Sequence, residues 1–353
     1  MQNYLQEKFL HFEPPKHTGQ RFRMIDKKVN DTQKRLILIN DFTGFGRCAL
    51  NVSLPTVSAF GIQGVPVPTA ILSNHLGFKS YFYEDFAENL PAYLENLTAL
   101  SFPFDGIYTG YLGSAKNAET VIEFVNKRKN TKNPPIIITD PVMGDNGRPY
   151  STHTDALLKS LTRLVSISDY LTPNLTEACM LTGTEYSGNF SDQELFEIAN
   201  KLMSLMTYNS NKKKTCNNTN SAGTSTQADS DTKTDIALIS PDKDNLTPCT
   251  TYSGSKKIVI TGIPYENEIG NLIYEEGKAP IILKSKIAGA ARPGTGDIFA
   301  SIVSSYAIMG EDFKESVCLA SRFISECIRE SDRLNIPPLY GVCFERKLDM
   351  LIK

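Results

Sequence analysis

The chain has 353 residues, of which 41% are hydrophobic, and it carries 37 basic against 39 acidic side chains for a net charge of −2. This length and composition suit one large α/β domain or two smaller ones with a sizeable core. A charge so close to neutral provides no broad basic surface, so we expect neither nucleic acid nor an anionic membrane as a partner.

Cysteine usage and the N-terminal composition indicate a reducing compartment. The seven cysteines are scattered and form no C-x-x-C pair. No apolar run approaches the roughly 18 residues that a membrane span needs. Residues 1–34 are mostly polar and lack the apolar core of a secretory signal. We therefore expect free thiols, a cytoplasmic protein and an N-terminal polar extension over 1–34.

The first predicted strand covers 35–40, and a glycine-rich turn at 43–46 and a helix to about residue 60 follow it. Residues 65–72 predict a second strand, and 85–100 have helical spacing with Pro91 as an interruption. Strands are then predicted at 106–109, 135–139 and 170–171, and helices at 114–129, 154–165, 175–181 and 191–206.

The composition changes at 208–255, which is rich in Asn, Ser, Thr, Lys and Asp. Such a segment cannot bury enough apolar surface to offset its ordering entropy, so we expect a disordered insertion in a single domain over 35–353. Strands at 257–261, 272–274 and 280–283 and helices at 297–309 and 313–329 complete the pattern. This alternation predicts an α/β fold with a doubly wound, mostly parallel sheet and helices on both faces.

The strongest motif is Gly294-Thr295-Gly296-Asp297, at the start of an apolar-periodic helix. Glycines at a helix N-terminus let backbone amides approach an anion, and the helix dipole favours negative charge there. Asp297 would direct its carboxylate to the same place. On spacing alone, a glycine turn followed by a first-turn aspartate explains the motif equally well.

Further carboxylates follow predicted strands. Asp140 comes directly after the strand at 135–139, Asp145 lies five residues later, and Glu177 follows the strand that ends at 171. Ligands of α/β proteins bind at the carboxyl ends of parallel strands, and hard oxygen ligands there suit Mg²⁺ with a nucleotide. Each residue alone is more simply a turn aspartate or a helix-capping glutamate, but together they indicate a site.

Two nucleotide fingerprints match only in part. Gly44-Phe-Gly46-Arg-Cys-Ala49 resembles the dinucleotide motif, but no acidic residue ends the next strand. The spacing from Gly289 to Gly294 resembles a Walker A loop without its lysine.

In order and spacing, the motifs resemble those of the vitamin B6 (pyridoxal) kinases of the ribokinase-like superfamily. The match extends from about residue 36 to 329, apart from the insertion. The residues that carry it are Thr109-Gly-Tyr111, Asp140-Pro-Val-Met-Gly-Asp145, Thr172-Pro-Asn174-x-x-Glu177, Gly294-Thr-Gly-Asp297, Ser73-Asn-His75 and Asn40-Asp-Phe-Thr-Gly-Phe-Gly-Arg47.

The resemblance implies an ATP-dependent kinase with Mg²⁺. Asp297 would be the general base, and the amides of Gly294, Thr295 and Gly296 would form the anion hole. Asp145 and Glu177 would act on Mg²⁺, and residues 144–150 would form a flap over the phosphates. The resemblance also places Asp140, Thr172, Asn174, Thr261 and Thr295 around the nucleotide.

For the substrate, the resemblance implies that Asp41, His75 and Tyr111 contact the pyridine ring of a vitamin B6 vitamer. It also implies a homodimer. Leu76 is a departure, because many of these kinases have Thr there, so one polar contact to the ring is in doubt. The alternatives are a hydroxymethylpyrimidine kinase of the same superfamily, in which Cys often follows the second glycine of the motif, and a binding protein without turnover.

Overall fold

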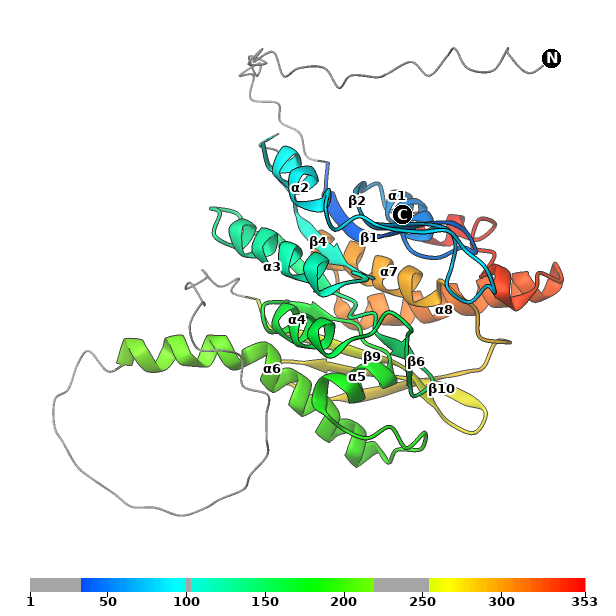
Figure 1. Cartoon of the computed structure of the whole chain (residues 1–353). Coiled ribbons are helices and arrows are strands. Elements are labelled where there is room, and N and C mark those ends of the chain that lie inside the picture. The colour runs from blue at the N-terminus through cyan, green and yellow to red at the C-terminus, as the bar shows by residue number, and fades with distance from the viewer. Residues whose placement is uncertain (1–32, 100–102, 219–253, 353) are drawn as a thin grey trace, which may run out of the picture. The chain divides into compact units, whose positions relative to one another are not determined.

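The computed structural model describes residues 33–99, 103–218 and 254–352, which fall within one unit, Gln33–Lys353. A 9-stranded sheet crosses these described residues in the order β11-β10-β9-β8-β5-β4-β1-β2-β3 (Figure 1). The central strands are parallel neighbours: β2 (Gln63–Asn74), β1 (Arg35–Phe45), β4 (Gly106–Thr109), β5 (Ile136–Thr139), β8 (Tyr170–Leu171) and β9 (Lys257–Pro264).

The antiparallel strands lie at the two ends of the sheet. β3 (Tyr83–Asp85) pairs with β2, while β10 (Glu268–Glu275) and β11 (Ile281–Lys286) continue the sheet beyond β9. The predicted mostly parallel, doubly wound sheet is therefore confirmed.

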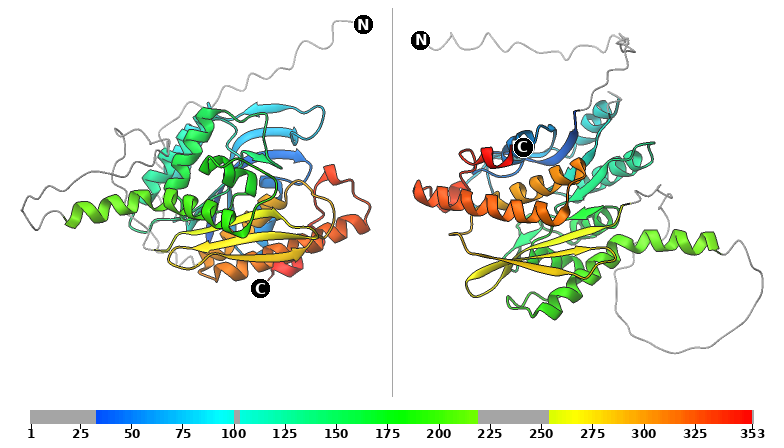
Figure 2. Two further views of the ribbon diagram at one scale, coloured as in Figure 1. Left: turned by 90° about the horizontal axis from the view of Figure 1, so that it is seen from below. Right: turned by 180° about the vertical axis from the view of Figure 1, so that it is seen from behind.

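Helices cover both faces of the sheet, as the two views of Figure 2 show. One face carries α1 (Leu50–Ala59), α7 (Thr295–Met309) and α8 (Phe313–Arg333). The other carries α2 (Leu90–Ala99), α3 (Ala115–Lys129), α4 (Asp155–Ser166), α5 (Leu175–Thr182) and α6 (Asp192–Asn218). Two short 3₁₀ helices, η1 (Pro338–Tyr340) and η2 (Leu348–Leu351), end the described chain.

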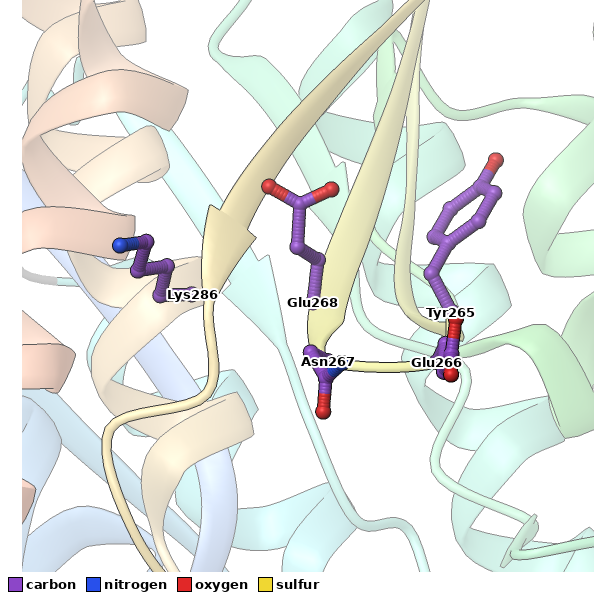
Figure 3. A pocket seen from close by; sticks show the side chains of 5 residues that line it. All are labelled: Tyr265, Glu266, Asn267, Glu268 and Lys286. Carbon is purple, nitrogen blue, oxygen red and sulfur yellow. The ribbon is translucent and has the colours of Figure 1, made fainter.

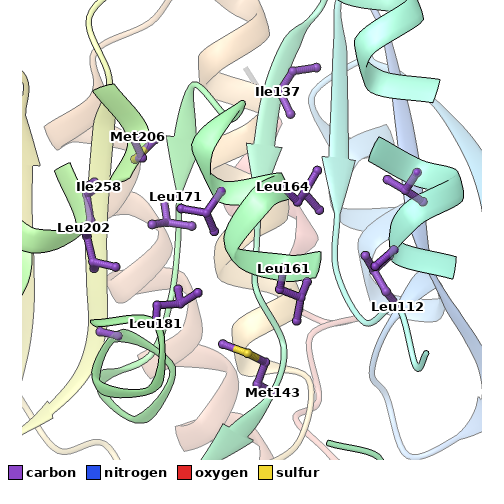
Figure 4. Close-up of a cluster of buried hydrophobic side chains, with 14 of the residues drawn as sticks. Leu112, Ile137, Met143, Leu161, Leu164, Leu171, Leu181, Leu202, Met206 and Ile258 are labelled. Carbon is purple, nitrogen blue, oxygen red and sulfur yellow. The ribbon is translucent and has the colours of Figure 1, made fainter. Parts of the chain in front are cut away.

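The core divides into two clusters because neighbouring strand residues point to opposite faces. In β1, Ile37 and Ile39 pack with α2–α6, whereas Leu36 and Leu38 pack against α1, α7 and α8. Figure 4 shows part of the first cluster. Burial on both faces explains why the strands are continuous apolar runs without polar alternation.

Several predicted boundaries were wrong. β1 does not turn at 43–46 but continues to Phe45, because β2 extends beside it as far as Asn74. The stretch predicted as a helix from 85 begins at the last residue of strand β3, and its helix starts only at Leu90. Pro91 thus lies in the first turn, where a missing backbone N–H interrupts nothing.

α6 runs longer than its predicted end at 206. A capping box starts the helix: the Glu194 carboxylate accepts from the Ser191 N–H at 2.8 Å and the Ser191 hydroxyl accepts from the Glu194 N–H at 3.3 Å. The helix then continues to Asn218, into the segment expected to be an insertion. The rest of that insertion and the N-terminal extension lie outside the described residues, apart from the short stretches beside β9 and β1. No helix in the described ranges is long and apolar enough to cross a membrane.

Candidate active site

The predicted site residues gather along the edge of the sheet where the parallel strands end. Tyr111 lies just past β4, Asp140 directly follows β5, and Thr172 directly follows β8. Asn40 and Asp41 occupy the part of β1 just beyond its pairing with β4. Loops at this edge of an α/β sheet are the usual location of a ligand site.

Asp297 lies in the first turn of α7, and two polar groups from the N-terminal part of the chain hold its carboxylate. Asn40 Nδ2 donates to Oδ1 at 2.8 Å, and the Ala49 N–H donates to Oδ2 at 2.9 Å. Burial raises the pKa of Asp297 above its usual value, and these two hydrogen bonds act in the opposite direction. The surroundings thus fix the carboxylate in place and make it more basic than an exposed aspartate.

Gly294 precedes the helix in a left-handed conformation, with φ of 82°. A Cβ on this residue would lie 1.8 Å from the carbonyl oxygen of Arg47, so only glycine fits. The Thr295 hydroxyl donates to the Arg292 carbonyl at 3.1 Å and closes the turn. The amides of residues 294–296 lie at the helix start, where no carbonyl of the same helix can accept from them.

Three more carboxylates are buried at this edge: Asp41, Asp140 and Glu177. Burial raises the pKa of Asp41 to about 7, although the Thr43 hydroxyl donates to it, and the charge of Asp297 adds to the rise. Burial also raises the pKa of Asp140 well above its usual value, with further contributions from Glu177 and Asp297. Buried carboxyl groups with raised pKa values would ionise when a cationic or metal-bound ligand binds beside them, so the site favours such a ligand.

Glu177 closes a capping box at the start of α5. It accepts from the Asn174 N–H at 2.9 Å, and Asn174 Oδ1 accepts from the Glu177 N–H at 2.9 Å. The Met143 N–H also donates to its carboxylate, at 3.1 Å. Burial raises the pKa of Glu177 to about 8, although the hydrogen bonds from these N–H groups act to lower it. The capping interpretation of Glu177 is therefore confirmed, and a role with Mg²⁺ would be additional.

The predicted flap is a small hairpin of β6 (Gly144–Asp145) and β7 (Arg148–Pro149). Two hydrogen bonds hold it over the start of α5: Asn174 Nδ2 donates to the Gly144 carbonyl at 2.8 Å, and the Gly147 N–H donates to Thr176 Oγ1 at 2.8 Å. The hairpin leaves the Asp145 side chain exposed beside the buried Glu177.

The expected nucleotide residues lie on adjacent strand ends. Asn174 and Thr261 form an isolated parallel bridge, and the Thr261 N–H donates to the Pro173 carbonyl at 2.9 Å. The Thr172 hydroxyl is buried without a hydrogen-bond partner in the described residues. A buried orphan hydroxyl at a strand end is a polar group available to a ligand.

Two of the three residues that the resemblance gave to the pyridine ring, Asp41 and Tyr111, contact Asn40. The Tyr111 N–H donates to Asn40 Oδ1 at 2.8 Å, and the Asp41 N–H donates to the same oxygen at 3.0 Å. Sequence reasoning gave Asn40 no role of its own, although its place between an apolar run and Asp41 marks a strand end.

His75 makes two hydrogen bonds to the main chain. Its Nδ1 accepts from the Gly77 N–H at 3.1 Å, so the neutral ring carries its proton on Nε2 and donates to the Leu339 carbonyl at 2.8 Å. The Phe78 ring lies 4.7 Å away, centroid to centroid. With both nitrogens engaged in this way, His75 offers a ligand the face or edge of its ring.

The geometry is compatible with Mg²⁺ only when a nucleotide supplies further ligands. Among the described residues, no three His, Cys, Asp or Glu side chains lie close enough together to hold a metal ion. Mg²⁺ commonly takes one or two protein carboxylates and completes its shell with water and phosphate oxygens. Asp145 and Glu177 fit that smaller requirement.

A surface hollow of about 620 Å³ lies at the β11 end of the same sheet edge (Figure 3). It is lined by Tyr265, Glu266, Asn267, Glu268 and Lys286, where β9 and β11 end and β10 begins. Asp297 and the glycine turn are absent from this lining, so the hollow is separate from the candidate reacting centre.

Comparisons with known proteins show which family this chain matches. A family model described as "Phosphomethylpyrimidine kinase" matches residues 50–225 and 242–339. The chain is 25% identical over 301 residues to the hydroxymethylpyrimidine/phosphomethylpyrimidine kinase of Aquifex aeolicus, spanning 84% of this chain and 94% of that protein. It is 26% identical over 162 residues to the pyridoxal kinase of Arabidopsis thaliana, spanning 45% of this chain but only 52% of that protein.

A solved structure extends the similarity. The Bacteroides thetaiotaomicron protein proposed as a phosphomethylpyrimidine kinase, crystallised with pyridoxal, has a TM-score of 0.73 and 26% identity, and the match covers 91% of this chain and 96% of that one. The pyridoxal kinase of Lactobacillus plantarum, at 19% identity and a TM-score of 0.71 over 91% of this chain and 97% of that one, shows the shared fold.

Proposed function

The chain belongs to the phosphomethylpyrimidine kinase family, phosphotransferases that act on a hydroxymethyl group, and from this premise we propose that it transfers the γ-phosphoryl group of ATP to the 5′-hydroxymethyl group of a vitamin B6 vitamer. The vitamer would be pyridoxal, pyridoxine or pyridoxamine. A cytoplasmic location and a homodimer are part of the proposal and rest on the composition and the resemblance, respectively.

The observation that carries the proposal is the placement of Asp297 beside the glycine turn. The carboxylate is held by Asn40 and Ala49 at 2.8 and 2.9 Å, so it needs no rearrangement to accept a proton from a bound alcohol. The amides of 294–296 begin the same helix and favour the negative charge that develops on the transferred phosphoryl group. Phosphoryl transfer needs this kind of positioning and charge stabilisation more than covalent chemistry.

On the nucleotide side, we propose that Asp140, Thr172, Asn174, Thr261 and Thr295 line the ATP site. Asp145 and Glu177 would hold Mg²⁺ together with the phosphates, Glu177 partly through water. The bound metal would neutralise charge on the phosphate oxygens. The β6–β7 hairpin, tied to the start of α5, would cover the phosphates and exclude water.

On the substrate side, Asp41, His75 and Tyr111 would line the site for the pyridine ring. The raised pKa of Asp41, about 7, lets its carboxyl group either donate or accept a hydrogen bond near neutral pH. Tyr111 offers an aromatic ring to a flat heterocycle. These features suit a pyridine that carries several polar substituents.

Hydroxymethylpyrimidine is the second candidate substrate. The Aquifex relative favours it, because that match spans nearly the whole of both chains, whereas the chain spans about half the length of the Arabidopsis pyridoxal kinase. Asp297 favours the vitamer, because pyrimidine kinases that resemble this chain often have Cys at that position.

A substrate panel tests the proposal. The purified protein is incubated with ATP and Mg²⁺ and, separately, with each of the three vitamers and with hydroxymethylpyrimidine, and products are identified by mass spectrometry. We expect a monophosphorylated vitamer with the highest kcat/KM. A much higher kcat/KM for hydroxymethylpyrimidine than for every vitamer would overturn the substrate assignment.

A further inference from the structure

Residues 337–345, which we call the C-terminal strap, contact three separate parts of the candidate site. The strap begins at Pro337, includes η1 and ends at Glu345. His75 donates to its Leu339 carbonyl, and Arg292, just before the glycine turn, donates to its Pro337 and Gly341 carbonyls at 3.3 Å each. The strap therefore lies against both the loop after β2 and the loop before α7.

The third contact is made by Arg47, which binds the strap at two points. Its Nε donates to Glu345 Oε1 at 2.7 Å, and its Nη1 donates to the Tyr340 carbonyl at 3.1 Å. Gly341, with φ of 78°, lies directly on the same turn, since a Cβ there would come within 2.2 Å of the Gly46 carbonyl oxygen. The strap thus holds the Gly46–Ala49 turn through a side chain and through close backbone packing.

This turn has a backbone conformation that it would not adopt without support. Arg47 and Ala49 have φ of 52° and 55°, a region that side chains with a Cβ occupy rarely. Such residues persist only where the surrounding structure fixes them, and they cluster at functional sites. Here the strap supplies the support at Gly46 and Arg47.

The held turn contacts the reacting centre directly. The Ala49 N–H donates to Asp297 Oδ2 at 2.9 Å. The Arg47 carbonyl lies against Gly294, at the position where only glycine fits. One short turn therefore sets both a hydrogen bond to the carboxylate and the packing of the anion cradle.

We propose that Arg47 is a positioning residue for Asp297: by tying the Gly46–Ala49 turn to the C-terminal strap, it keeps the Ala49 N–H on the carboxylate. The expected effect of Arg47 on catalysis rests on the proposed function, whereas its expected effect on the Ala49 hydrogen bond does not. Without Arg47, the turn would relax, the Ala49 hydrogen bond would weaken, and the ionised form of Asp297 would be less favoured.

The charge of Asp297 helps to raise the pKa values of several ionisable groups around it. They are Asp41 on β1, Cys48 in the turn itself, Asp140 after β5, Tyr108 on β4 and Tyr150 after β7. Substitution of Arg47 leaves all of them in place. Arg47→Lys keeps the positive charge at this position, so a shift of the acid limb that it shares with Arg47→Ala reports on the Ala49 hydrogen bond and not on the lost charge.

The experiment compares Arg47→Ala with Arg47→Lys and with a matched control, Arg163→Ala. Arg47 and Arg163 both form ion pairs at the surface, with side chains that are 30% and 39% exposed, but Arg163 pairs with Glu119 between α3 and α4. Two readouts are taken: hydrogen exchange at the Ala49 amide, which needs no substrate, and kcat against pH.

We expect faster Ala49 exchange in Arg47→Ala, a kcat lower by roughly tenfold near neutral pH, and an acid limb moved to higher pH. The KM for ATP should change little. Arg47→Lys should recover part of both effects, because its ammonium reaches one of the two acceptors, and Arg163→Ala should match the unmodified protein.

Unchanged exchange at Ala49 in Arg47→Ala would overturn the proposal, and so would faster exchange with an unmoved acid limb. If no variant or parent phosphorylates any substrate while Ala49 exchange still rises, the proposed function fails and the positioning of the turn stands.

Discussion

At the scale of single residues, Asn40 connects the groups that the proposed reaction needs. Its Nδ2 holds Asp297, and its Oδ1 accepts from the backbone N–H groups of Tyr111 and Asp41. Asn40 is fully buried, so no water competes for these bonds. One amide side chain thereby fixes the proposed base and two proposed ring contacts relative to one another.

Asp41 should make the unliganded protein less stable as the pH rises. Its pKa is about 7 in the folded protein, above the usual 3.8, so the stability that it contributes is fully present below pH 4 and is lost as the pH rises through 7. Asp41→Asn removes this loss. Thermal or urea unfolding should show the variant about equal to the parent near pH 4 and more stable by about 2–4 kcal/mol at pH 8. A variant that is destabilised equally at both pH values would contradict the assignment.

Leu76 should tune the choice among vitamers without changing the substrate class. It directly follows His75 and is partly exposed, where many related kinases have Thr. Leu76→Thr offers one hydrogen bond of about 0.5–1.5 kcal/mol, which corresponds to roughly tenfold or less. The kcat/KM values of the three vitamers should therefore shift relative to one another by no more than that. A variant that prefers hydroxymethylpyrimidine would show that Leu76 determines more than vitamer preference.

At the scale of elements, the two edges of the sheet use buried charge differently. The edge where the strands end collects carboxylates whose pKa values are raised by burial. At the opposite edge, Asp169 is fully buried but paired: it accepts from Lys256 Nζ at 2.9 Å and from the Ile137 N–H at 2.9 Å, and Lys129 Nζ lies 3.5 Å away. Charge is compensated where it supports the fold and left uncompensated where a ligand is proposed.

Asp169→Asn should destabilise the fold, because it leaves two lysines at a nearly dry site without their counter-charge. The side chains of Lys129 and Lys256 are only 6% and 11% exposed, and breaking such a pair costs about 3–5 kcal/mol. Asp105→Asn is a matched control, since Asp105 also accepts from a lysine and a backbone N–H, but in an exposed pair worth about 0–1 kcal/mol. Similar losses in urea unfolding for both variants would contradict the argument.

Local patterns predicted the elements well where one apolar run or one amphipathic stretch forms one element. The helix α3 and the strands β4 and β5 follow directly from short-range sequence. Local patterns failed where a partner far away in the sequence decides how long an element is or what a side chain contacts. β1 continues past Asn40 only because β2 extends beside it, and nothing near Asn40 reveals that its amide meets Asp297, 257 residues away in sequence. The strap was missed for the same reason, because its contacts with Arg47 and His75 are set by packing rather than by pattern.

At the scale of the whole described chain, the site is built from parts far apart in sequence. β1 supplies Asn40 and Asp41, the turn before α1 supplies the Ala49 N–H, α7 supplies Asp297, and the strap follows α8. α1 and α7 pack together on one face of the sheet, which brings the turn and the glycine motif together. A substitution in the turn before α1 or in the glycine motif of α7 can therefore alter the hydrogen bonding of the same carboxylate, that of Asp297.

Deletion of residues 219–253, closed by a short Gly/Ser linker, should leave kcat and thermal stability nearly unchanged. The prediction rests on composition, because a segment so poor in large apolar side chains cannot form a core. Shortening a connection of this length also changes its closure entropy only slightly, by about 0.6 kcal/mol for each halving of length. A large drop in melting temperature would show that this segment contributes to the folded domain.

The measurement that tests the central claim most directly is the single-turnover rate of Asp297→Asn with ATP and a vitamin B6 vitamer. The substitution keeps the shape of the side chain and lets its amide oxygen accept one of the two hydrogen bonds from Asn40 and Ala49, but it removes the proposed base. We predict a rate lower by roughly 10²–10⁴ with little change in nucleotide affinity, because the amides of the glycine turn remain. A rate near that of the parent would contradict the account, and Asp297 would then be only a favourable residue in the first turn of α7.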